Sequence, residues 1–255
     1  MSRPRRALVC FGAAFALAFG CTQVGTNPDV PVAIQLFPPP SPATIVGDTM
    51  RDSTGAAVPL RVLVFNSAND SIPGAPVRFL ALDSTGRLTL DTATGTVVAN
   101  DTGQVAVVAQ VGSLQSTPDT IVVVDTPSVM LAVDPALDTL VYTFSTRDTL
   151  LPLRVRLLHL PDSAAIRHYQ VRYAFVYPQS YDNADTTKAQ LVSASRVASA
   201  VDTTDATGGT NRYLRVAPFT LPLSDSVILD VTAVGPGGGV VAGGPVRYIV
   251  HLRIQ

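Results

Sequence analysis

Three histidines, His159, His168 and His251, are the side chains with the most evident potential for chemistry in the 255-residue sequence. A zinc site requires three or four converging ligands drawn from His, Cys and carboxylate side chains. His168 and His251 fall on the outward phase of two alternating segments, which allows them to lie together on one exposed face. We interpret all three as surface histidines and expect no metal site.

The acidic side chains are 19 Asp and no Glu. Without Glu, the chain contains neither an HExxH zinc helix nor the last ligand of an EF-hand. The segment 181–186 carries Asp182, Asn183 and Asp185, and calcium takes six to eight oxygen ligands. A calcium site there remains open, but we favour a polar hairpin loop.

Glycine clusters at 235–239 and 243–244 lie between two segments of strand-like sequence. A phosphate-binding loop needs a following helix and usually a Lys, and a strand-like segment follows here instead. We therefore predict a flexible hairpin connection. The sequence has no G-x-S-x-G nucleophile elbow, and nothing distinguishes one Asp pair as a glycosidase pair. We expect a non-enzymatic protein without a cofactor.

Arginine is the residue type whose positions in the sequence are typical of a protein-binding surface. Its planar guanidinium pairs with carboxylates and is enriched at interfaces. Five arginines occupy the outward phases of three alternating segments, and if those segments are neighbours they form one face. That face either binds a partner or is a solvated sheet surface. The five are Arg154, Arg156, Arg172, Arg247 and Arg253.

The elements that position these residues are predicted to be strands. The chain has 35 Val, 26 Thr and a single Lys, Lys188, a composition that favours strands over helices. Segments of four to twelve residues with β-branched or alternating apolar residues support this. They are 32–37, 60–65, 77–82, 96–99, 104–111, 121–124, 153–157, 166–177, 227–233 and 246–254.

The aromatic residues follow the same alternation. Tyr169, Tyr173 and Tyr177 share a phase with Val171 and Phe175, which favours a core position over a ligand-binding stripe. The chain has seven Tyr and no Trp, so the usual sugar-stacking side chain is missing. The net charge of −1 gives no electrostatic case for nucleic-acid binding.

The first 21 residues resemble a bacterial lipoprotein signal. Three arginines precede an uncharged run at 7–20, which suits a signal-peptide hydrophobic region and is short for a membrane span. Gly20-Cys21 is similar to the lipobox, although Ala18 and Phe19 depart from its usual residues. The resemblance implies cleavage before Cys21, acylation of its sulfur and, because Thr22 follows, anchoring in the outer membrane.

The rest of the chain divides into a tether and two modules. We expect a signal peptide at 1–20, a proline-rich tether with a possible first edge strand at 21–43, and modules at 44–126 and 127–255. Removal of Cys10 with the signal leaves Cys21 alone, so no intrachain disulfide forms. A partial echo between 73–79 and 242–248 favours two modules of one kind.

The first module is similar to the bacterial immunoglobulin-like domains of the invasin and intimin type. The resemblance rests on the segment 72–79, IPGAPVRF, followed by 100–105, NDTGQV. Val105 stands where Ala is common in the family, and the intervening segment is shorter. The second module keeps only the GPVRY echo. The resemblance implies β-sandwich spacer, adhesion or assembly modules, and it carries over no catalytic residue.

Together these observations predict an all-β protein with two tandem immunoglobulin-like sandwiches after a lipoprotein signal and tether. The expected function is a non-enzymatic cell-envelope lipoprotein that presents an adhesion, scaffolding or assembly surface to another envelope protein. The alternative is a module that binds carbohydrate or a surface polymer. We expect membrane attachment through Cys21, and neither nucleic acid nor a small-molecule ligand.

Overall fold

The computed structural model describes residues 29–143, 149–216 and 225–255. These residues form twenty β-strands and one short 3-10 turn, η1 (Pro236–Gly238), which confirms the predicted all-β class. The Val- and Thr-rich composition explains this result, because β-branched side chains pack well on a pleated surface. In these three ranges, no helix combines the length and the hydrophobicity needed to span a bilayer. The signal peptide and Cys21 lie outside the described residues.

We call residues 29–126 the N-terminal half and residues 127–255 the C-terminal half. The strands of the N-terminal half are β1 (Ala33–Leu36), β2 (Ala43–Ile45), β3 (Val62–Phe65), β4 (Arg78–Ala81), β5 (Leu88–Leu90), β6 (Val97–Ala99), β7 (Gly103–Val111), β8 (Leu114–Gln115) and β9 (Asp119–Val124). Those of the C-terminal half are β10 (Val129–Ala132), β11 (Leu137–Tyr142), β12 (Thr149–Pro152), β13 (Val155–His159), β14 (Ala164–Ala165), β15 (Gln170–Tyr177), β16 (Gln190–Ser193), β17 (Val201–Thr203), β18 (Arg212–Val216), β19 (Ser226–Ala233) and β20 (Val246–Ile254).

The main sheet of the N-terminal half has the order β2-β9-β7-β4, with β8 paired to β7. β2 runs parallel to β9, and the other pairs in this sheet are antiparallel. Two short pairs, β1 with β3 and β5 with β6, supply the remaining strands. A compact core that includes Met50, Phe79, Val97 and Ile121 gathers beneath these strands.

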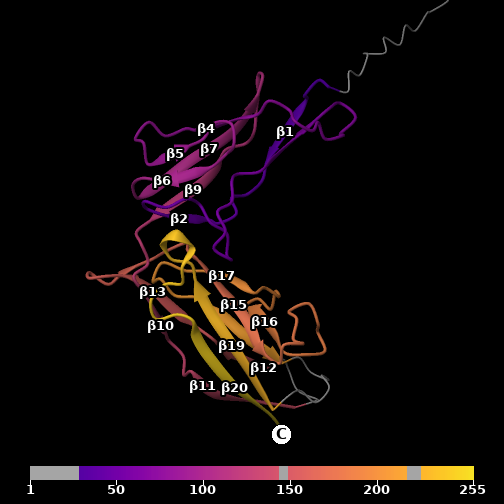
Figure 1. Ribbon diagram of the computed structural model, residues 1–255. Coiled ribbons are helices and arrows are strands. Elements are labelled where there is room, and N and C mark those ends of the chain that lie inside the picture. The colour runs from indigo at the N-terminus through magenta and orange to yellow at the C-terminus, as the bar shows by residue number, and fades with distance from the viewer. Residues whose placement is uncertain (1–28, 144–148, 217–224) are drawn as a thin grey trace, which may run out of the picture.

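The C-terminal half is a sandwich of two layers. One layer is the five-stranded sheet β11-β20-β19-β15-β17, in which β11 runs parallel to β20. The other contains β10-β13-β14 and β12-β18-β16. β12 and β13 continue each other along one segment of chain. Leu153 N donates to Arg212 O and Leu157 N donates to Gly208 O, so both strands run beside the segment 208–216. Figure 1 shows the sheets of this half below those of the N-terminal half.

The strand order of the C-terminal half is that of an immunoglobulin-like sandwich. In that topology strands A, B, E and D face strands C, F and G. β10, β12 with β13, β18 and β16 take the first four places, and β15, β19 and β20 take the others. β17 is an additional edge strand beside β15. The orders β2-β9-β7-β4 and β11-β20-β19-β15 match each other, each with one parallel pair at the same end.

The sequence echo does not mark equivalent positions in the two halves. The segment 73–79 leads into β4, whereas 242–248 leads into β20, the last strand. Gly74 and Gly243 both have positive φ, near 72° and 82°, so both segments are a glycine turn followed by a strand. The similar sequences of 73–79 and 242–248 therefore reflect a similar glycine turn. What the two halves share is the order in which their strands pair. The domain boundaries at 44 and 127 stay a prediction.

β15 buries only part of its aromatic row. Tyr169, just before the strand, and Tyr173 are buried, which agrees with the predicted core phase. A bulge between Phe175 and Tyr177 shifts the register against β19, and Tyr177 is 51% exposed. The extra residue of a bulge moves the following side chain to another direction, so the inward phase ends before Tyr177.

The core of the C-terminal half extends into the N-terminal half. Ala43 and Ile45 of β2 and Val124 of β9 belong to the same buried cluster as Val171 and Val231. β2 is the edge of its sheet, and its position against the C-terminal half covers it. The two halves therefore share apolar packing across their junction.

Candidate functional site

The structure divides the five arginines between the two layers of the C-terminal half. Arg154 precedes β13 and Arg156 lies on it, in one layer. Arg172 on β15 and Arg247 and Arg253 on β20 lie in the five-stranded sheet. All five are exposed, and the buried cores of the two layers lie between the groups. The arginines therefore form two groups that point away from each other, and they do not make up one continuous surface.

Two of the five arginines are already paired with carboxylates. Arg154 binds Asp134 through Nη2 at 2.7 Å and through Nε at 3.1 Å. Arg247 binds Asp230, its neighbour across β19 and β20, at 2.7 Å and 2.8 Å. The hydrogen bond to its carboxylate and the negative charge raise the pKa of each arginine. These pairs fix the side chains, and their guanidinium forks are occupied.

Arg156 lies beside a small depression in the same layer. This depression has a volume of about 110 Å³ and is also lined by Val133, Asp205 and Thr207. Asp205 caps its own turn, accepting hydrogen bonds from Thr207 N at 2.7 Å and Thr207 Oγ1 at 2.7 Å. These bonds hold the pKa of Asp205 below its usual value. The carboxylate offsets part of the positive charge of Arg156.

The outer surface of the five-stranded sheet is the larger arginine surface. Leu137 and Val141 of β11 are 62% and 42% exposed, and in the register of the sheet Val141 lies opposite Arg253. Arg247 and Arg172 lie further along the same sheet, separated by β19. We call this surface, Arg172, Arg247 and Arg253 with Leu137 and Val141, the outer face. It combines cationic forks with exposed aliphatic side chains.

The histidines lie apart from one another. His251 pairs across the sheet with Ser226, at the start of β19, and its Nδ1 lies 2.9 Å from Ser226 Oγ. His168 precedes β15, whose Val171 pairs with Ala233 at the other end of β19. His168 and His251 therefore do not lie together, because β15 and β20 both pair antiparallel with β19 and place the two histidines beside opposite ends of that strand. His159 Nδ1 contacts Thr126 O at 2.8 Å.

In the acidic loop at 181–186, the Asp side chains accept hydrogen bonds from nearby backbone amides. Asp182 Oδ1 accepts a hydrogen bond from Ala184 N, and Asp185 accepts from Thr187 N and from Lys188 Nζ. The hydrogen bonds from Thr187 and Lys188 lower the pKa of Asp185 to about 2. In the part of the chain that the structure describes, no group of three His, Cys, Asp or Glu side chains is placed to hold a metal ion.

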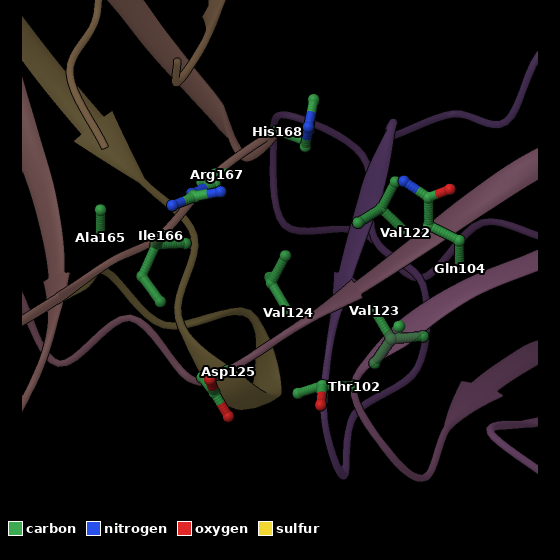
Figure 2. A pocket seen from close by; sticks show the side chains of 11 residues that line it. Thr102, Gln104, Val122, Val123, Val124, Asp125, Ala165, Ile166, Arg167 and His168 are labelled. Carbon is green, nitrogen blue, oxygen red and sulfur yellow. The ribbon is translucent and has the colours of Figure 1, made fainter. Parts of the chain in front are cut away.

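A cleft lies at the junction of the two halves, and no pattern in the sequence predicted it. Its volume is about 310 Å³. Figure 2 shows Thr102, Gln104 and residues 122–125 on one side and residues 165–168 on the other. His168 in this cleft has a positive φ of 57°, which is uncommon outside glycine. Side chains of both halves thus line one depression beside the shared core.

Asp48 links the two halves next to this junction. Its Oδ2 accepts hydrogen bonds from Arg51 Nε at 3.0 Å and from Gly237 N at 2.9 Å, the latter in η1 of the C-terminal half. Burial raises the pKa of Asp48, but the bonds from Arg51, Gly237 and Thr49 outweigh it, so the net pKa lies below its usual value. The glycine cluster predicted to be a flexible hairpin is thus held by a carboxylate.

The turn that contains Gly55 and the loop that contains Gly238 also approach each other closely. A Cβ added to Gly238 would lie 2.9 Å from Gly55 O, and one added to Gly55 would lie 3.0 Å from Gly238 O. Gly55 and Gly238 also have positive φ, near 90° and 86°. Glycine is required at both positions, because a side chain would both strain the backbone and push the loops apart.

Two further contacts join the halves. Gln170 Nε2 donates to Pro40 O at 3.3 Å, and Pro40 belongs to the proline-rich segment predicted as a tether. Thr126 O, at the end of the N-terminal half, contacts His159. The junction therefore consists of shared apolar packing, one carboxylate link and side chains that reach the opposite backbone.

Comparison with known proteins gives no family assignment. No family model matches the sequence, and no curated protein matches it. Among solved structures, the chain is similar to domains 5-6 of the S-layer protein SbsC, with a TM-score of 0.31 and 13% identity over 90% of this chain and 100% of that one. It is similar to the Yersinia pseudotuberculosis adhesin InvE, with a TM-score of 0.32 and 15% identity over 86% of this chain and 58% of that one. It is also similar to the D00-D0 domain of Intimin, with a TM-score of 0.26 and 11% identity over 86% of this chain and 97% of that one.

Proposed function

We propose that this chain is a non-enzymatic cell-envelope lipoprotein, anchored in the outer membrane through acylated Cys21. Two tandem immunoglobulin-like modules at 44–126 and 127–255 follow the tether and act as a stiff display. They present an adhesion, scaffolding or assembly surface to another envelope protein. The C-terminal half supplies the contact.

The observation that carries this proposal is the packed junction. Relative motion is the default between two domains unless their interface is large and apolar. Here Ala43, Ile45 and Val124 enter the core of the C-terminal half, and Asp48 binds Gly237 across the junction. A protein that holds a binding surface at a fixed distance and angle from a membrane needs such a stiff connection.

The outer face is the proposed contact surface. Interface centres are enriched in Arg and in apolar side chains that lose water on binding. Arg172 and Arg253 carry charge on this face, and Leu137 and Val141 supply exposed apolar area beside Arg253. A partner with carboxylates spaced along a flat surface fits it. Arg154 and Arg156 lie on the opposite layer and serve as an internal comparison.

The anchor is tested by replacing Cys21 in the full chain. More than one acyl chain is needed for stable attachment, so Cys21→Ser should move the protein from the membrane fraction to the soluble fraction of the envelope. Cys10→Ser is the matched control, because Cys10 lies within the segment that signal cleavage would remove. Equal membrane retention of the Cys21→Ser variant would contradict the anchor.

The contact surface is tested with charge reversals in the full chain. Arg172→Asp combined with Arg253→Asp should abolish retention of an envelope protein that the parent chain retains from detergent extracts. Arg156→Asp should leave that retention unchanged. A glycan array addresses the alternative, because binding of a carbohydrate or surface polymer predicts specific array signals and protein binding predicts a blank array. Retention unaffected by the double reversal would remove the outer face from consideration.

A further inference from the structure

Nine of the 19 aspartates are followed directly by threonine. In five of these pairs, one carboxylate oxygen of Asp accepts a hydrogen bond from the main-chain amide of the following Thr, with N to Oδ1 distances of 2.7–2.9 Å. The nine aspartates are Asp48, Asp91, Asp101, Asp119, Asp125, Asp138, Asp148, Asp185 and Asp202. Two of the five bonded pairs lie on the two edge strands of the five-stranded sheet.

The first edge is β11. Ile249 N donates to Ala136 O and Gln255 N donates to Tyr142 O, so the even-numbered residues of β11 direct their backbone groups to β20. Backbone groups of successive strand residues alternate sides, so the amide of Thr139 points away from the sheet. Asp138 Oδ1 accepts a hydrogen bond from that amide at 2.7 Å. The central outward donor of this edge is therefore occupied.

The second edge is β17. Thr204 N donates to Tyr169 O and Tyr173 N donates to Ala200 O, so the even-numbered residues of β17 face β15. The amide of Thr203 points outward, and Asp202 Oδ1 accepts its hydrogen bond at 2.9 Å. Asp202 is itself held, because its Oδ2 accepts from Asn211 N at 2.7 Å and its Oδ1 lies 3.1 Å from Arg212 Nη2.

The edges of the N-terminal main sheet are closed by other means. β2 packs against the C-terminal half, with Ala43 and Ile45 only 2% and 3% exposed. At β4, Phe79 N donates to Thr92 O on the side away from β7. An uncovered edge strand is a template for pairing with another chain, and natural sheets close such edges in several ways. The Asp-Thr pairs close both edges of the five-stranded sheet, and at β17 Arg212 Nη2 adds to the closure by donating to Val201 O.

We propose that Asp138 and Asp202 block strand addition at both edges of the five-stranded sheet. Each carboxylate takes the amide that an incoming strand needs as a donor, and it places negative charge where that strand's carbonyl would lie. A partner of the C-terminal half therefore binds through a face or through loops and does not extend the sheet. This inference concerns which part of the C-terminal half can pair with another chain, and it does not depend on the proposed envelope partner.

The strand that this block excludes most directly is β11 of a second copy of the chain. Antiparallel pairing about Thr139 places Leu137 of one copy opposite Val141 of the other. Both side chains are exposed. The backbone groups of residues 137, 139 and 141 point away from β20, and they match in this register. The edge is self-complementary apart from the carboxylate on the Thr139 amide.

The test uses the full chain and measures self-association by sedimentation velocity over a range of concentrations. Asp138→Ala should self-associate about tenfold more tightly than the parent chain, because one amide becomes free within a complementary edge. Asp101→Ala is the matched control: it removes the same type of bond, to Thr102 N at 2.8 Å, in an exposed turn. It should behave as the parent chain does.

Two further variants separate the hydrogen bond from the charge. Asp138→Asn keeps an oxygen acceptor and should self-associate less than Asp138→Ala. Adding Thr139→Pro to Asp138→Ala removes the amide itself, which edge strands tolerate, and should restore the behaviour of the parent. Unchanged association of Asp138→Ala, equal gains for Asp138→Ala and Asp101→Ala, or equal gains for the Ala and Asn variants would each overturn the proposal.

Discussion

Asp48 accepts a hydrogen bond at 2.9 Å from the amide of Gly237, a residue 189 positions further along the chain. The bond joins the turn after β2 to the loop between β19 and β20. It is reinforced by Arg51, which binds both oxygens of Asp48 at 3.0 Å. One carboxylate thereby neutralises a local arginine and fixes a glycine-rich loop of the other half.

Replacing Asp48 should loosen this junction. Asp48→Ala removes the acceptor of Gly237 N and leaves Arg51 without its carboxylate, so we expect a loss of about 1–3 kcal/mol in the free energy of unfolding. Hydrogen exchange at the Gly237 amide should accelerate, whereas exchange in β7 should not. Asp91→Ala, which removes a carboxylate from an exposed turn, is the control and should leave the Gly237 amide unchanged. Slow exchange of Gly237 in the Asp48 variant would contradict the assignment.

Acid should destabilise the protein through the same group. Burial raises the pKa of Asp48, but its hydrogen bonds outweigh that effect and leave the pKa below the usual 3.8. A carboxyl with a depressed pKa in the folded state contributes stability above its unfolded-state pKa and loses it as the pH falls through the folded-state pKa. Asp134, bound by Arg154, has a lowered pKa as well.

Urea unfolding at several pH values measures this effect. The free energy of unfolding should fall as the pH drops from about 4 towards 2, and the difference between the parent chain and Asp48→Asn should shrink over that range. A difference that stays constant from neutral pH to about pH 2 would show that the Asp48 carboxylate is not the titrating group.

The two layers of the C-terminal half are joined by a buried phenol. Tyr173 of β15 is 1% exposed, and its hydroxyl donates to Leu153 O at 3.0 Å and lies 2.7 Å from Thr210 Oγ1. Tyr173→Phe leaves these partners without the hydroxyl and should lower the free energy of unfolding by about 1–2 kcal/mol. Tyr177→Phe, on the same strand but exposed, should have no measurable effect. Equal effects of the two variants on thermal unfolding would refute the tie between layers.

A second link between the layers is the ion pair of Arg212 and Asp202. The Arg212 side chain is 4% exposed, its Nη2 lies 3.1 Å from Asp202 Oδ1, and it also donates to Val201 O. Asp202→Ala leaves a buried cation without its carboxylate, so we expect a loss of about 3–5 kcal/mol. The double variant Asp202→Ala, Arg212→Met removes both charges and should recover most of it. Denaturant titration tests this, and a double variant as unstable as the single one would be the contrary result.

Strand positions followed closely from the sequence. Residues 246–254 were predicted as a strand and form β20 with the same bounds, and the segments at 104–111 and 227–233 differ from β7 and β19 by one residue. Alternation is a local property, because successive side chains point to opposite faces.

Short or weakly alternating strands were not found in this way. β2 has three residues, all buried, and β17 has three residues at an edge. Their strand state depends on a neighbour distant in sequence: β2 pairs with β9, and β17 with β15. No local pattern contains that information.

The sequence alone determined the β class, the positions of the long strands and the outward phase of the five arginines, because composition and alternation act within a few residues. Tertiary structure alone decided that those arginines divide between two layers, that the histidines lie apart and that Asp48 meets Gly237. Each of these depends on which strands pair and in which direction, and pairing brings together residues whose separation along the chain leaves no periodic trace.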